Sequence, residues 1–232
     1  MGKINVNMHL KMLLGVIFLM ALNLQVFPVI FGNGSGNGYC DGIPKPGCLP
    51  PPGLAAITPG NGPGIEALVR EGGGYFLNAH SLTMALLNQV EMSDLNGLDY
   101  DILNKTANDA LLNIRCARSI YIALVDMAEN TLYNPEVTAK LRAFDYRAFM
   151  EKNNLNREIF KKLAAYLSSD DITGMYRHIL HEITGIETLL TTICSDIALH
   201  RQPGLQLLWK TGETFSETLL FGHYAARVFY AL

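Results

Sequence analysis

Histidine is the residue type in this chain whose chemistry and spacing best suit a functional site. Four of the six histidines fall in segments with helical periodicity: His80, His178, His181 and His223. If neighbouring helices run antiparallel, these histidines lie at similar positions along the helix axes. His181, for example, comes 22 residues before Pro203, and His223 comes 20 residues after it. Imidazoles from facing helices can converge on one axis, and Glu182 lies at the same height. The spacing predicts a cluster that holds a metal ion or a non-covalently bound haem.

The sequence around these histidines also supports a second interpretation. Neither a Glu-x-x-His pair nor a His-Glu-x-x-His motif occurs, since Gly185 stands where the second histidine of that motif would follow His181. On a helix, His178 and Glu182 lie beside the apolar stripe and His181 points away from it. Histidines in such positions usually make hydrogen bonds or face water. The metal or haem site is therefore the alternative hypothesis.

Nucleophilic catalysis has less support. No Gly-x-Ser-x-Gly turn occurs, and no strand pattern is present to carry one. A cysteine nucleophile would have to be Cys116 or Cys194 beside a histidine, and export would oxidise an exposed thiol. No Cys-x-x-Cys motif is present, which argues against thioredoxin-like redox chemistry. The sequence favours a non-enzymatic role.

The first 32 residues resemble a secretory signal in their pattern of charge and hydropathy. Lys3 and Lys11 precede an uninterrupted apolar run over residues 12–22, which has the length of a signal h-region. The alternative is an uncleaved membrane anchor over 12–31, although polar residues and a proline interrupt that stretch. The sequence therefore predicts export to the periplasm or the extracellular space, with a membrane tether if the signal is not cleaved.

Residues 33–74 have the composition of a flexible tail. They hold 12 of the 21 glycines and 7 of the 10 prolines, and such a stretch cannot bury a core. Cys40 and Cys48 are close in sequence, so we predict a local disulfide between them. Cys116 and Cys194 are far apart in the chain and either pair or remain two thiols. A short helix over 65–71 is expected to end at the three glycines 72–74.

Residues 75–232 are predicted to form an all-α domain. Long helices are expected over about 75–92, 99–131 and 205–232, with two shorter ones over 136–153 and 156–167. A further long helix is expected to run to about residue 200 after a cap formed by Ser169-Asp170-Asp171. The third long helix carries an apolar stripe, from Ile172 to Ile197, whose spacing alternates between three and four residues. The fold class is a four-helix bundle with a helical hairpin inserted between the second and third long helices, preceded by the Gly/Pro-rich tail.

The last helix is apolar almost all round from residue 219 onward. Either the hairpin or a partner protein covers it. If a partner does, the expected contact residues are Leu220, Phe221, Tyr224 and Val228. The formal net charge of −3 supplies no basic field for nucleic acid. The leading hypothesis is an exported, non-enzymatic protein that binds a protein partner or assembles with itself.

Overall fold

The computed structural model describes residues 65–92, 97–130 and 135–232, which all belong to the compact unit that begins at Gly47. Those residues are mostly helical and include no strand, so the all-α class is confirmed for this part of the chain. The predicted signal segment, the tail up to residue 64 and the predicted Cys40–Cys48 disulfide lie outside the described residues.

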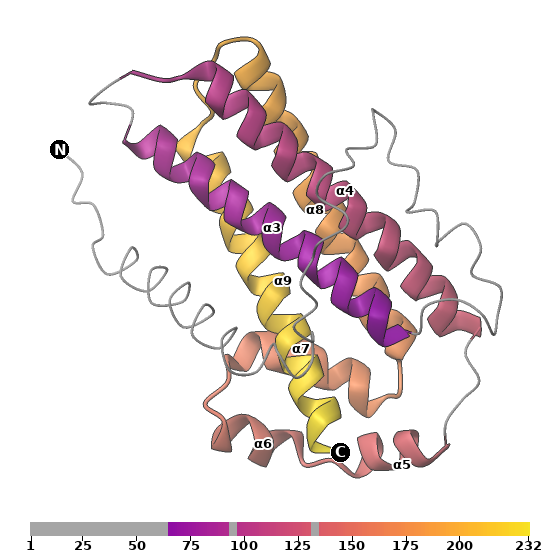
Figure 1. The fold of residues 1–232 in the computed structure, drawn as a ribbon. Coiled ribbons are helices and arrows are strands. Elements are labelled where there is room, and N and C mark those ends of the chain that lie inside the picture. The colour runs from indigo at the N-terminus through magenta and orange to yellow at the C-terminus, as the bar shows by residue number, and fades with distance from the viewer. Residues whose placement is uncertain (1–64, 93–96, 131–134) are drawn as a thin grey trace. The chain divides into compact units, whose positions relative to one another are not determined.

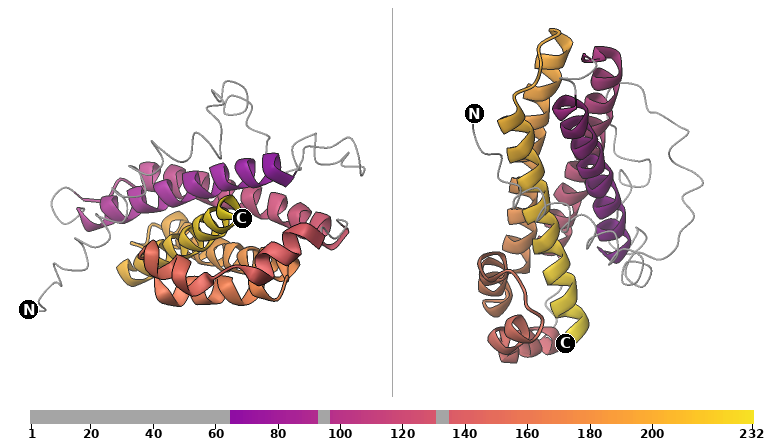
Figure 2. Two further views of the ribbon diagram at one scale, coloured as in Figure 1. Left: turned by 90° about the horizontal axis from the view of Figure 1, so that it is seen from below. Right: turned by 90° about the vertical axis from the view of Figure 1, so that its left-hand side faces the viewer.

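Four long helices make up most of the described chain (Figure 1): α3 (Ile65–Glu91), α4 (Tyr100–Asn130), α8 (Ile172–Ala198) and α9 (Leu205–Ala231). Each packs mainly against two others, in the order α3, α4, α8, α9 and back to α3. Figures 1 and 2 show neighbouring long helices running in opposite directions. This closed arrangement lets every long helix bury one side against two neighbours.

The predicted apolar stripe of the third long helix faces the core. From Met175 onward, each of its members on α8 is buried: Met175, Ile179, Ile183, Ile186, Leu190, Ile193 and Ile197. The aromatic rings of Phe76 on α3 and Phe215 on α9 meet in the same interior, with centroids 4.9 Å apart. Helix α8 begins where expected, because the Asp171 side chain accepts a hydrogen bond from the Gly174 amide.

The expected helix break at the three glycines is wrong, because α3 continues through residues 72–74. Gly72 is buried where α3 crosses α4, and a Cβ atom there would lie 3.0 Å from Ile120 Cγ2 and 3.1 Å from Tyr121 Cε2. A Cβ on Gly74 would meet nothing within 4 Å. Gly72 therefore permits close helix contact, and the packing of α3 against α4 outweighs the poor helix propensity of the three glycines.

Three short helices connect α4 to α8 where two were predicted: α5 (Pro135–Ala143), α6 (Tyr146–Lys152) and α7 (Arg157–Ser168). The predicted helix 136–153 is divided because the Asp145 carboxylate accepts a hydrogen bond from the Ala148 amide and starts a new helix. The predicted helix 156–167 agrees with α7, whose cap is Asn156. Helix α7 buries its apolar side against α8 and α9, and α5 and α6 pack on α7.

Candidate functional site

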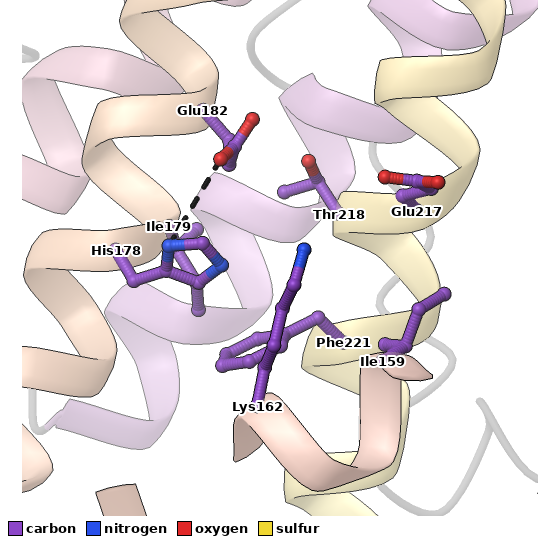
Figure 3. Close-up of a pocket in the computed structure, with 8 residues that line it drawn as sticks. All are labelled: Ile159, Lys162, His178, Ile179, Glu182, Glu217, Thr218 and Phe221. Carbon is purple, nitrogen blue, oxygen red and sulfur yellow. Dashed lines mark ion pairs between the residues drawn. The ribbon is translucent and has the colours of Figure 1, made fainter. Parts of the chain in front are cut away.

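His178 lies where α7, α8 and α9 meet. Its ring is stacked on the Tyr166 ring of α7 at 5.8 Å and meets the Phe221 ring of α9 at 4.8 Å and 66°. Its Nδ1 is 3.9 Å from an oxygen of Glu182, one turn further along α8. Figure 3 shows this pair beside the Phe221 ring. The imidazole therefore has aromatic neighbours on two helices and an acidic neighbour on its own.

A small pocket opens beside this histidine. Its polar rim also includes Lys162 from α7 and Glu217 from α9, and its apolar wall includes Ile159 and Phe221. The Lys162 ammonium points into the space between α8 and α9 (Figure 3). The volume is about 30 Å³, which suits a water molecule or two and is far below the size of a metabolite site.

The groups around His178 act on its pKa in opposite directions. Burial lowers the pKa of His178, the Glu182 carboxylate raises it, and the charges of Lys162 and His181 lower it further. The net direction is downward from the ordinary value of 6.5. Since loss of hydration disfavours the charged form, the ring is a neutral imidazole at neutral pH.

His80 lies deeper in the molecule, on α3, and only 7% of it is exposed. Its Nε2 is 3.5 Å from Ser216 Oγ on α9, and its ring is 5.6 Å from that of Phe215. Burial lowers the pKa of His80 to about 4. The Ser216 hydroxyl donates its hydrogen to the Gly212 carbonyl at 2.9 Å. The Ser216 oxygen is thus closer to this carbonyl than to the imidazole, an arrangement that does not favour general-base activation of the serine.

The other two predicted ligands lie apart from a common centre. His181 is exposed on α8, while His223 is half-buried on α9 with its ring 6.1 Å from that of Tyr224. Burial, followed by the charge of Arg227, lowers the pKa of His223. Among the described residues, no three His, Cys, Asp or Glu side chains are grouped so that they could hold a metal ion.

Helix register explains why His80 and His178 lie apart. His80 meets α9 at Phe215, whereas His178 meets it at Phe221. Six residues of helix correspond to about 9 Å along the axis, which is too far for ligands of one ion. The two cysteines left open by the sequence, Cys116 and Cys194, are thiols and are not joined in a disulfide. Burial raises the pKa of Cys194, which disfavours a reactive thiolate.

The predicted partner contacts on α9 lie mostly in the interior of the chain. Phe221, Tyr224 and Val228 are all buried within the chain, and Leu220 is half-buried. Helix α7 provides part of the cover. The Asn156 amide donates a hydrogen bond to the Tyr224 hydroxyl at 3.0 Å, and the Tyr224 ring is 6.1 Å from that of Phe160. The inserted segment, the first of the two possibilities from the sequence, therefore covers this side of α9.

Sequence reasoning missed a group of exposed apolar side chains, which we call the apolar end. Its members are Met92 (66% exposed), Ile102 (52%), Leu199 (61%) and Leu205 (41%). The Tyr100 and His200 rings are 5.0 Å apart, so the start of α4 and the connection from α8 to α9 lie at the same end of the helices (Figure 1). The sequence feature that could have indicated this surface is the position of Leu199 and Leu205, which flank the Pro203-Gly204 break and lie outside the α8 stripe.

Comparison with known proteins adds no assignment, because no family model, curated protein or solved structure matches the chain significantly. Within the described ranges, no helix is both long enough and apolar enough to cross a membrane.

Proposed function

We propose that this chain is an exported, non-enzymatic protein that acts by binding a protein partner or a second copy of itself. In this proposal the four long helices form a four-helix bundle, and residues 135–168 are a helical unit inserted into it. The apolar run over 12–22 behind two lysines supports export. The apolar end supports the binding role and is the observation on which that role rests.

The arrangement of the four side chains matters more than their number. Single exposed leucines and isoleucines are ordinary on protein surfaces, whereas several gathered at one end favour an interaction site. Burying one such side chain contributes at most roughly 1.5–3 kcal/mol to association. Several buried together can therefore hold a second protein chain without charged contacts.

Light scattering after size-exclusion chromatography tests self-association through this surface. We expect wild-type protein to form a species larger than a monomer, and the double variant Ile102→Glu/Leu199→Glu to weaken the dissociation constant at least about tenfold. The matched control is Ile122→Glu, because Ile122 lies on the same helix as Ile102 and is 46% exposed. The control should keep the wild-type mass.

A photo-crosslinking amino acid at position 102, compared with the same amino acid at position 122, tests for a different partner in the native compartment. Crosslinks to protein from position 102 alone support the proposal. A monomer at every concentration, together with equal crosslinking from the two positions, overturns it. A stoichiometric metal or a haem absorption band in the purified protein would instead favour the alternative of cofactor binding by histidines.

A further inference from the structure

The segment 135–168 is attached to the long helices at the two ends of α7. At the N-terminal end, the Asn156 amide binds the Tyr224 hydroxyl. At the C-terminal end, Tyr166 stacks on His178, which in turn meets Phe221. Between these two ends, α7 buries Ile159, Phe160, Leu163 and Leu167 against α8 and α9, and α5 and α6 pack on α7.

A further contact joins α6 to α9 near the first of these ends. The Arg227 guanidinium donates a hydrogen bond to the Asn153 side chain and lies 6.0 Å from the centre of the Phe149 ring. At the other end of α7, the Tyr166–His178–Phe221 contact contains an imidazole, a group that titrates near neutral pH. A second imidazole, that of His223, lies near the first end, with its ring 6.1 Å from that of Tyr224.

The charged and titratable groups that face His178 come from all three helices. Lys162 faces it from α7, Glu182 and His181 from α8, and Glu217 from α9 across the pocket. Glu182 favours the imidazolium, while burial, Lys162 and His181 oppose it, and the opposing effects prevail. The adjoining pocket gives a proton a route from solvent to the ring.

We propose that His178 is an acid-sensitive switch, whose protonation in mildly acidic solution raises the fraction of molecules in which α7 is separated from α9. Separation returns the imidazolium to water and removes it from the Lys162 ammonium. Because the separated form binds the proton more tightly, proton binding draws the equilibrium toward it. Phe221 and Tyr224, which are buried in the structure, then become accessible.

Hydrogen exchange of the full chain, followed by mass spectrometry, measures this opening. We compare amides of α7 with those of α4 at about pH 5 and about pH 7.5, after correction for the intrinsic exchange rate. The expected result is faster exchange of α7 at the lower pH, with α4 less affected. His178→Phe retains a ring between Tyr166 and Phe221 and cannot titrate, so it should abolish the acid response of α7. His200→Gln, an exposed histidine at the far end of α8, should leave it unchanged.

Two further variants at the pocket rim should change the acid response in opposite directions. They test the proposal even if the His178→Phe variant fails to fold. Lys162→Gln removes a charge that opposes protonation, so it should reduce the acid response. Glu182→Gln removes the charge that favours the docked imidazolium, so it should enlarge the response. Overturning results are an α7 exchange rate independent of pH in wild type, a full acid response in His178→Phe, or the same direction of change in the two rim variants.

Discussion

Burial controls the chemistry of the described histidines whose pKa values shift. His80, His178 and His223 are on three different helices, and loss of hydration is the largest cause of the lowered pKa of each. Each of them is in or against α9. A histidine that is neutral in the folded state and charged in the unfolded state makes folding depend on pH. Its contribution to stability is present above its unfolded pKa and is lost as the pH falls below it.

The clearest case is His80, whose pKa is about 4 in the folded state against an ordinary value of 6.5. Between these values the unfolded chain binds more protons, so acidification lowers the free energy of unfolding. His80→Phe cannot bind this proton, so its free energy of unfolding should fall less than that of wild type on acidification. Between pH 7 and pH 4, we expect the difference between the two proteins to shift in favour of His80→Phe by on the order of 3 kcal/mol. Urea unfolding at both pH values measures the difference, with His200→Phe as the exposed control. Parallel pH profiles for wild type and His80→Phe would contradict this account.

At the scale of the helix, contacts between helices override local preference. Three consecutive glycines favour a break, and α3 nonetheless continues through them because Gly72 fits against Ile120 and Tyr121 of α4. The opposite happens near Asp145, where a side-chain cap divides a segment that periodicity alone predicts as one helix. Both differences arise from particular side-chain contacts.

The two glycines Gly72 and Gly74 provide a matched pair of variants on one helix. Gly74→Ala should raise the free energy of unfolding by about 0.5–1 kcal/mol, because alanine favours helix and its Cβ meets nothing within 4 Å. Gly72→Ala should lower it by about 1–3 kcal/mol, since the new Cβ would crowd the fully buried Ile120. Thermal or urea unfolding of both variants checks the signs. Equal stabilisation by the two changes would show that α3 has room to move away from α4.

At the scale of the whole chain, the proposed roles divide between segments. The apolar run at residues 12–22 directs the chain out of the cytoplasm in the proposal, and the four long helices present the apolar end. Ion pairs between α4 and α8 help to hold the helices that present the apolar end. Arg115 and Arg118 of α4 both contact Glu187 of α8, and Arg177 of α8 pairs with Glu129 of α4. Such partly exposed pairs orient the helices more than they stabilise them.

Export is tested by placing a charge inside the apolar run. The Ile17→Asp variant should stay in the cytoplasm at full mass, because a charge disrupts the h-region of a signal. Asn7→Asp adds the same charge outside the run and should be exported as wild type is. Cell fractionation and mass spectrometry of the recovered protein measure both. A wild-type chain found in the membrane at full mass would support the anchor, and one found in the cytoplasm would contradict export.

The sequence by itself determined the helical class, the α8 stripe and the cap that precedes α8, because periodicity and capping depend on neighbours within a turn or two. It could not determine which surfaces those helices meet. Only the tertiary structure decided that α7 covers Phe221 and Tyr224, and that His80 and His178 meet α9 six residues apart. These outcomes depend on the register between helices, which is set by the packing of side chains far apart in the chain.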